Sequence, residues 1–278
     1  MNTLHRCKPQ LGTLVEVSVT GDVSDKALIN LSNNVFKHCA DVETKMSFHN
    51  ANSELSNINR NAHQQAITMS EDMTKVMTLA LQLSELTNGL YDVTIAPELV
   101  ASGLLPNHGL DLDPTSNWQD ISIIGNQISF QRPLAIDLGG IAKGYAVDKA
   151  MTQAEPDCQV IINAGGDLKM SHWQTQTASL RIPYSPSSAT KEIPMQAAAL
   201  ATSGHYFLDG NIAIINPLTK QASNHDISIS VFADSCMLAD ALTKVAFLCQ
   251  DSQPIFSSLN ASFICLDREG KFSSQLTK

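Results

Sequence analysis

The chain has 278 residues, of which 43% are hydrophobic, and this length and composition are typical of a soluble globular protein with one large core or two modest domains. The formal net charge is −9 and no cluster of lysine and arginine is visible, so binding to the phosphate backbone of nucleic acid is disfavoured. No apolar run is long enough to cross a bilayer.

The N-terminus and the cysteines bear on the compartment. The first residues contain Arg6 and Lys8 but no apolar core region, and Cys7 lacks the apolar approach of a lipid-attachment site. Six cysteines, at positions 7, 39, 158, 236, 249 and 265, form no close pair, which predicts reduced and mostly buried thiols. As it stands, the sequence predicts a cytoplasmic protein, or an exported one whose leader has been removed.

Periodicity and capping residues predict the elements of the first half of the chain. These are, in order, a strand from Gly12 to Val19, a long amphipathic helix from Ala27 to Met46 capped by Ser24, a short capped helix from Ser53 to Asn59, a helix that follows the N-cap Ser70 and stops at Asn88-Gly89, and a hairpin that pairs Ile121–Ile124 with Gln127–Phe130. Between the last two lies a stretch from Leu90 to Pro97, predicted as a loop or short strand.

The stretch from Asp137 to Tyr145 reads Asp-Leu-Gly-Gly-Ile-Ala-Lys-Gly-Tyr and has the layout of an anion site. Gly139 and Gly140 allow backbone angles that other residues avoid. The unpaired N–H groups of the following helical turn, with the charge of Lys143 beside them, are expected to face a phosphate. On this stretch alone, a turn that needs glycine only for tight packing is an equally good interpretation.

The second half of the chain alternates strands with two helices. The predicted elements are a strand from Leu134 to Asp137, a helix from Ile141 to Met151, strands from Gln159 to Asn163, Leu180 to Pro183, Ala197 to Ala201, Ile212 to Ile215 and Ile227 to Phe232, a helix from Cys236 to Leu248, and a strand from Ser262 to Leu266. Thr202 to Tyr206 is predicted as a polar turn that donates hydrogen bonds to a ligand, or is simply a turn. The order of elements indicates a mixed α+β architecture.

Taken together, these stretches resemble the ApbE family, the FAD:protein FMN transferases, from about Leu11 to Phe272. The matching stretches are Leu11-Gly-Thr13, Met46-Ser47, Ser53-Glu54 with Asn59, Thr87 to Thr94 ahead of Pro97, Asp137 to Tyr145, Asn163 to Asp167, Ala201 to Gly204 and Ala239 to Leu242. Each stretch is short, but their shared order and spacing identify the chain as a member of this family. The resemblance implies a single α+β domain with features of the T-fold, in which two intertwined lobes surround a flavin nucleotide cleft.

The resemblance also implies a role for each loop. The isoalloxazine ring of FAD is expected near Met46 and Tyr91, because an aromatic face and a thioether suit a flat π system. The implied FAD-binding residues are Met46, Tyr91, Asp92, Thr94, Asp137, Gly139, Gly140, Lys143, Gly166, Asp167, Ser203 and Gly204. A magnesium ion is implied at the backbone carbonyl of Ala142 and at Asp240 and Thr243.

The implied reaction moves the FMN half of FAD to a Ser or Thr hydroxyl of an acceptor protein and releases AMP. It needs charge stabilisation on the diphosphate and a base for the hydroxyl. Family members usually carry a His-Ile-Ile-Asp-Pro-Arg-Thr-Gly segment, which here reads Ala-Ile-Ile-Asn-Pro-Leu-Thr-Lys from Ala213 to Lys220. A base and a cation are therefore missing, and the catalytic candidates are Asp240 and a substitute histidine, His205 or His225.

The helix implied in metal binding departs from the family pattern as well. The usual threonine four residues after the aspartate is Lys244 here, and Thr243 stands one residue earlier. Thr243 could face the ion beside Asp240, or Lys244 could pair with Asp240 and replace the metal. The retained metal is slightly favoured, because a carboxylate beside a diphosphate is repulsive without a cation between them.

Three functions follow from the resemblance. The first is a magnesium-dependent flavin transferase. The second is a family member that binds FAD without transferring it, to which the altered segment from Ala213 to Lys220 points. The third is an FAD pyrophosphatase that forms FMN and AMP, which needs the metal but no surface for an acceptor protein.

Overall fold

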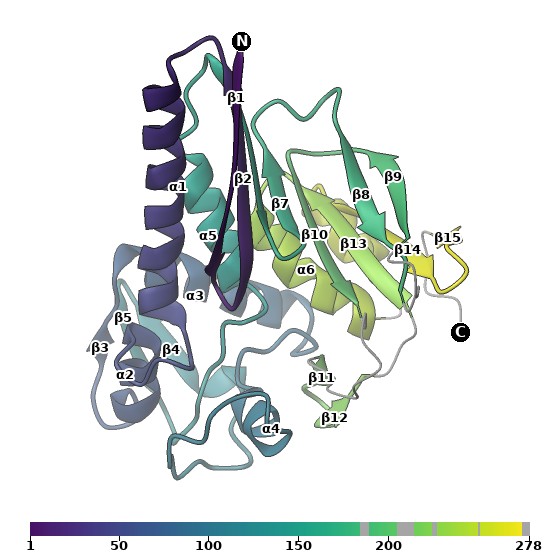
Figure 1. Cartoon of the computed structure of the whole chain (residues 1–278). Coiled ribbons are helices and arrows are strands. Elements are labelled where there is room, and N and C mark those ends of the chain that lie inside the picture. The colour runs from purple at the N-terminus through teal and green to yellow at the C-terminus, as the bar shows by residue number, and fades with distance from the viewer. Residues whose placement is uncertain (184–188, 205–213, 224–226, 250, 274–278) are drawn as a thin grey trace. The chain divides into compact units, whose positions relative to one another are not determined.

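The computed structural model describes residues 1–183, 189–204, 214–223, 227–249 and 251–273. Helices and antiparallel sheets are mixed along the chain, so the predicted α+β class is confirmed (Figure 1). The chain forms two compact units: unit 1 comprises Met1–Asp41, Lys143–Gly210 and His225–Lys278, and unit 2 comprises Val42–Ala142 and Asn211–Asn224. Neither unit is one continuous segment of the sequence.

Unit 1 is built on an eight-stranded antiparallel sheet. Its strands, in spatial order, are β1 (Asn2–Gln10), β2 (Thr13–Gly21), β6 (Cys158–Ala164), β7 (Asp167–Met170), β10 (Ala199–Gly204), β13 (Ile227–Ala233), β14 (Ser262–Asp267) and β15 (Phe272–Ser273). Strand β2 alternates as predicted: Val15, Val17 and Val19 are buried, whereas Leu14 and Glu16 are exposed.

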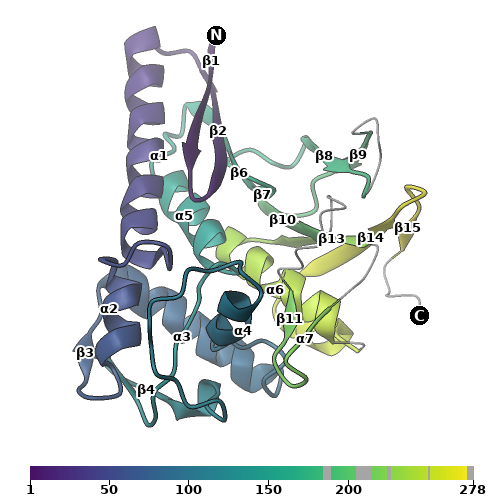
Figure 2. The same ribbon diagram turned by 60° about the horizontal axis from the view of Figure 1, so that its bottom comes forward.

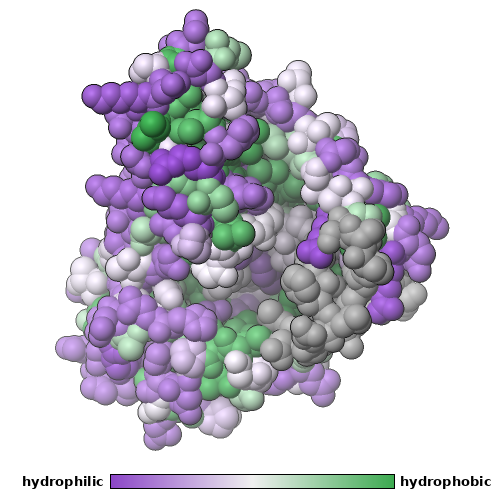
Figure 3. Space-filling view, viewed as in Figure 1, coloured by the Kyte–Doolittle hydropathy of each residue, from purple (hydrophilic) through white to green (hydrophobic). Residues whose placement is uncertain are grey.

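Three helices cover one face of this sheet. They are α1 (Asp25–Met46), α5 (Ala142–Met151) and α6 (Cys236–Leu248) (Figure 1). A short helix, α7 (Gln253–Ser258), follows α6 in the chain. The core beneath them includes Val15, Val17, Val19, Leu28, Leu31, Val35, Phe36, Val147, Val160 and Ile162. Hydrophilic side chains dominate the surface over α1 in Figure 3, so the predicted amphipathic helix is confirmed.

Among the residues that the structure describes, only a few cover the opposite face of the sheet. A hairpin of β8 (Thr177–Arg181) and β9 (Thr190–Pro194) lies over it, on the other side from α5 and α6 (Figure 2). Leu180 and Ile193 of the hairpin are buried with Leu200 and Phe232 of the sheet. This second apolar layer buries Leu200 of β10 and Phe232 of β13 on that face of the sheet.

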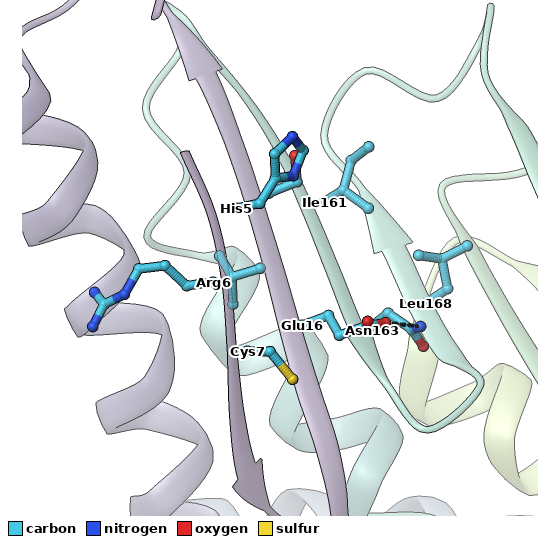
Figure 4. A pocket seen from close by; sticks show the side chains of 9 residues that line it. His5, Arg6, Cys7, Glu16, Ile161, Asn163 and Leu168 are labelled. Atoms are coloured by element: carbon cyan, nitrogen blue, oxygen red, sulfur yellow. Dashed lines mark hydrogen bonds between the residues drawn. The ribbon is translucent and has the colours of Figure 1, made fainter. Parts of the chain in front are cut away.

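Beyond the hairpin, the outer face of β1, β2, β6 and β7 forms an open groove of about 420 Å³ (Figure 4). Its lining includes His5, Cys7, Glu16, Ile161, Asn163 and Leu168. Asn163 donates to Glu16 across it at 2.9 Å, whereas Arg6 points toward α1 and donates to Ser32 Oγ at 2.7 Å. None of the predicted site residues lines this groove.

Unit 2 contains short helices and small sheets. Its elements are α2 (Glu54–Asn61), β3 (Ile67–Thr68), α3 (Glu71–Leu86), α4 (Ala96–Ala101), the 3₁₀ helix η1 (Trp118–Asp120), β4 (Ile121–Ile124), β5 (Gln127–Phe130), β11 (Ile215–Asn216) and β12 (Gln221–Ala222). Ser53 and Ser70 cap α2 and α3 as predicted, and the predicted hairpin of β4 and β5 is confirmed.

The strand predicted from Leu134 to Asp137 is wrong, because no strand is present there. The side-chain amide of Asn59 replaces a neighbouring strand: its Oδ1 accepts from the Ile136 N–H and its Nδ2 donates to the Ile136 carbonyl, both at 2.9 Å. The Asp137 N–H donates to the carbonyl of Val93 at 2.8 Å. Buried backbone groups are therefore satisfied without a ladder.

In unit 1, one predicted turn is wrong and one strand was not predicted. Thr202 to Gly204 belong to strand β10 rather than to a turn, because they pair with Ser228 to Ser230 of β13. Strand β1 was not predicted, because as an edge strand with mostly exposed or half-exposed side chains it lacks a continuous apolar face. Within the residues described, no helix is both long and apolar enough to cross a membrane.

The cysteines give a first test of the fold. No disulfide joins them, and only Cys7 is exposed. Burial raises the pKa of Cys158 and Cys236, and raises that of Cys265 to about 11. We expect iodoacetamide at pH 8 to label Cys7 first, since only an accessible thiolate reacts. Peptide mass spectrometry measures this order, Cys7→Ser is its control, and rapid labelling of Cys236 in the native protein would contradict the packing of α6.

Candidate functional site

Unit 1 brings together four charged residues that are far apart in the sequence: Lys143 at the start of α5, Asp167 at the start of β7, and Asp240 and Lys244 on α6. Lys143 Nζ lies 2.8 Å from Asp167 Oδ2 and 3.4 Å from Asp240 Oδ2. Lys244 Nζ lies 2.5 Å from Asp240 Oδ1 and 3.1 Å from the Asp240 backbone oxygen. We call these four residues the charge cluster.

The carboxylate side chains of the charge cluster are almost fully buried, whereas its lysine side chains are partly exposed. The side chains of Asp167 and Asp240 are 4% and 1% exposed, whereas those of Lys143 and Lys244 are 29% and 21% exposed. The formal charges sum to zero, and the lysines are the more exposed members of the charge cluster. The charge cluster is therefore suited to an anion, in a chain whose net charge is −9.

Burial and neighbouring charges set the pKa values in the charge cluster. Burial alone would lower the pKa of Lys143, but Asp167 and Asp240 outweigh it and hold that pKa above its ordinary value. Burial and the charge of Asp240 raise the pKa of Asp167 to about 6. Burial also opposes ionisation of Asp240, yet Lys143 and Lys244 hold its pKa below the usual range. At neutral pH the three groups are therefore mainly charged.

The packing of α5 against α6 positions these charges. Gly144 lets the two backbones touch, since a Cβ atom there would lie 2.7 Å from the carbonyl carbon of Cys236 and 2.9 Å from Asp240 Cβ. Asp148 of α5 accepts from the N–H groups of Cys236 and Met237 at 2.9 and 2.8 Å, at the N-terminus of α6. A carboxylate is favourable there because the helix dipole is positive at that end.

Hydroxyl groups lie beside the charge cluster. Ser203 Oγ is 2.8 Å from Thr243 Oγ1 and 3.4 Å from Lys244 Nζ. Thr243 Oγ1 donates to the backbone oxygen of Asp240 at 2.7 Å. Gly166, which precedes Asp167, has a φ of +104°, a conformation that favours glycine. Five residues predicted for the site therefore meet in unit 1, namely Lys143, Asp167, Ser203, Asp240 and Thr243, with Gly166 and Gly204 next to them in the chain.

The other predicted residues belong to unit 2: Met46, Tyr91, Asp92, Thr94, Asp137, Gly139, Gly140 and Ala142. Met46 and Tyr91 are only 3% and 5% exposed. Asp92 Oδ1 accepts from both the N–H and the hydroxyl of Thr94 at 2.8 Å, and burial raises the Asp92 pKa. The assignment of these residues to FAD stays a prediction.

A profile of the ApbE family matches residues 11–257. The chain belongs to the ApbE family. The FAD:protein FMN transferase of Vibrio cholerae is 26% identical over 86% of this chain and 79% of its own length, and that of Haemophilus influenzae is 27% identical over 75% and 69%. Two of the solved structures with the same fold have a TM-score of 0.83 each. A mutant of the flavin transferase ApbE from Vibrio cholerae is 24% identical, and the match covers 99% of this chain and 98% of that chain. The ApbE protein of Thermotoga maritima is 21% identical, and the match covers 99% of this chain and 97% of that chain.

Within the ApbE glycine motif, the structure corrects the reason for the glycines. Neither Gly139 nor Gly140 has a positive φ, so unusual backbone angles are not what this turn requires. The Gly139 N–H donates to Asp137 Oδ2 at 3.0 Å. The glycine that packing demands is Gly144, five residues further on. Sequence analysis missed it, because only the position of α6 makes a side chain at that residue impossible.

The altered segment also holds a cation that sequence analysis missed. Lys220 has a φ of +58°, which suits the glycine usual at this position, and its Nζ lies 3.2 Å from Glu98 Oε1 on α4. The sequence signal for this cation was Lys220 itself. It lies two residues after Leu218, and Leu218 stands at the position where the family has arginine. Ala213, His205 and His225 lie outside the described residues, so the histidine candidates stay predictions.

The donor set around Asp240 does not fit a magnesium ion. Lys244 contacts Oδ1, and Lys143 and the Gly144 N–H contact Oδ2 at 3.4 and 3.3 Å. The Thr243 hydroxyl is bonded to Ser203 and to the Asp240 backbone. Magnesium needs near-octahedral oxygen ligands at about 2.0–2.1 Å, and the described residues contain no group of three His, Cys, Asp or Glu side chains able to hold a metal.

Proposed function

We propose that this ApbE family member transfers the FMN half of FAD to a Ser or Thr hydroxyl of an acceptor protein and releases AMP. The acceptor oxygen forms a bond to the FMN phosphorus, the phosphoanhydride bond breaks, and the hydroxyl proton is released. The observation that carries the proposal is the charge cluster, in which two partly exposed lysine side chains pair with two buried carboxylates. The names of the relatives from Vibrio cholerae and Haemophilus influenzae support it.

In this proposal, Lys143 and Lys244 bind the diphosphate and stabilise the charge that develops on the AMP phosphate as it leaves. Positioned cations that face developing charge are among the largest contributions to such catalysis. Met46, Tyr91, Asp92 and Thr94 contact the flavin half, and Asp137, Gly139, Gly140, Gly166, Asp167, Ser203 and Gly204 surround the nucleotide.

One observation favours a second candidate, a family member that binds FAD without transferring it. Asn216 stands where the family has aspartate, and its Oδ1 accepts from the N–H groups of Leu218 and Thr219 at 2.9 and 3.2 Å. A neutral amide that caps its own turn cannot act as a general base. Leu218, in place of arginine, is 65% exposed and carries no charge.

A transfer assay separates the functions. The purified protein is incubated with FAD and a candidate acceptor that carries a single flavinylation hydroxyl, with an alanine variant of that acceptor as control. Covalent flavin on the first acceptor alone, with release of AMP, supports the transferase. Free FMN with no labelled acceptor identifies a pyrophosphatase, and unchanged bound FAD identifies the binding protein.

The role of the diphosphate gives a second prediction. Lys143→Met should weaken FAD binding at least tenfold and leave riboflavin binding nearly unchanged, because riboflavin carries no phosphate. Lys169→Met is a matched control: Lys169 also pairs with an aspartate, at 2.6 Å from Asp148, and is 19% exposed. Fluorescence quenching gives both dissociation constants. Equal losses for FAD and riboflavin would make Lys143 a structural residue only.

A further inference from the structure

Lys244 occupies a defined place on α6. It stands one helical turn after Asp240, so both side chains lie on the same face of the helix. Its Nζ has three oxygen neighbours, which are Asp240 Oδ1 at 2.5 Å, the Asp240 backbone oxygen at 3.1 Å and Ser203 Oγ at 3.4 Å. A lysine ammonium has three donors, so these contacts fix the charge in position.

The formal charge of the charge cluster is zero without a metal. Two ammonium groups balance two carboxylates, and the carboxylates are nearly sealed from water. A divalent ion at Asp240 would add two positive charges and would have to displace the Lys244 ammonium from Oδ1. Desolvated charges that lack a counter-charge are costly, so the balanced arrangement opposes such an exchange.

We propose that the Lys244 ammonium is the resident cation of this site and that the chain binds the diphosphate of FAD without a divalent metal. This inference rests on the proposed function, which supplies the diphosphate. The Lys244 side chain is 21% exposed, and its contact with Ser203 is long, so a phosphate oxygen can take the place of the serine. A lysine acts there as a point charge on the phosphate.

Calorimetry of the parent protein with magnesium chloride tests this without any turnover. We expect no heat of binding up to millimolar metal, with or without FAD, and the same dissociation constant for FAD in magnesium and in EDTA. Saturable magnesium binding that depends on FAD, or a tenfold loss of FAD affinity in EDTA, overturns the inference.

Three variants test the lysine itself. Lys244→Met should weaken FAD binding at least tenfold in metal-free buffer, whereas Lys169→Met should not. Lys244→Thr, which removes the ammonium and supplies an oxygen ligand, should recover FAD affinity only when magnesium is added. Riboflavin binding and thermal melting verify that the variants are folded. If Lys244→Met or Lys244→Thr binds FAD in EDTA as tightly as the parent, the inference fails.

These measurements stand apart from the proposed function. Failure of transfer to every acceptor would overturn the proposed transferase activity. The magnesium titration would still decide whether Lys244 or a metal ion is the cation of the site. Conversely, transfer that stops in EDTA would support the transferase and overturn the role of Lys244.

Discussion

Replacing Gly144 with alanine should lower the free energy of unfolding of unit 1 by about 3 kcal/mol or more, at the upper end of the range for overpacking. The new Cβ atom would lie 2.7 Å from the Cys236 carbonyl carbon and 2.9 Å from Asp240 Cβ. Both neighbours belong to the rigid helix α6, so α5 and α6 must separate. Urea unfolding followed by circular dichroism measures the loss.

Gly139→Ala is the control in the same motif. A Cβ atom at Gly139 would meet only the carboxylate of Asp137, at 3.0 Å, and a flexible side chain can move aside. We expect this variant to unfold close to the parent. If Gly144→Ala unfolds at the same urea concentration as Gly139→Ala, the two helices do not pack through this glycine.

Asp240→Asn should cost about 3 kcal/mol of stability, the lower end of the range for removing one member of a buried ion pair. The substitution keeps the shape of the side chain. It leaves Asp167 as the one carboxylate of the charge cluster against the two positive charges of Lys143 and Lys244. Because both lysine side chains are partly exposed, water offsets part of the penalty. Chemical unfolding at pH 7 and low salt measures it.

Two comparisons isolate the charge effect. The double variant Asp240→Asn with Lys244→Met should recover part of the lost stability, since it removes both partners of the Asp240–Lys244 ion pair. Together with the two single variants it forms a double-mutant cycle, which gives the coupling energy of the pair. Glu71 and Lys75 form a pair with the same helical spacing on α3 but are 83% and 56% exposed. Glu71→Gln should therefore unfold almost as the parent does. A stable Asp240→Asn variant would mean that Asp240 is not the counter-charge for both lysines.

Local signals in the sequence were sufficient for most helices. Helix α6 was predicted with the bounds that the structure has. The caps Ser53 and Ser70 were predictable because a serine cap bonds only to a backbone N–H three residues along, as both do in the structure. Such interactions are contained within a few residues. The sequence alone therefore predicts them well.

Interactions between distant residues account for the errors. Asn59 satisfies the backbone of Ile136, 77 positions away, and so replaces the strand that an apolar run predicted. The contact between Lys143 and Asp240 spans 97 positions. The motifs that carry the family resemblance named both residues, and the sequence left open whether Lys244 pairs with Asp240, which the fold shows.

The junction of α5 and α6 also bears on local opening of the native state. Gly144 brings the α5 backbone against Cys236 and Asp240, and Asp148, one turn later on α5, accepts from the first N–H groups of α6. Neither contact can break while the other keeps its geometry, because both belong to the same ten-residue helix. The amides of α6 should therefore exchange with deuterium together with those of α5, in one cooperative opening. The backbone positions of Lys143 and Lys244 then stay fixed relative to each other until unit 1 itself opens.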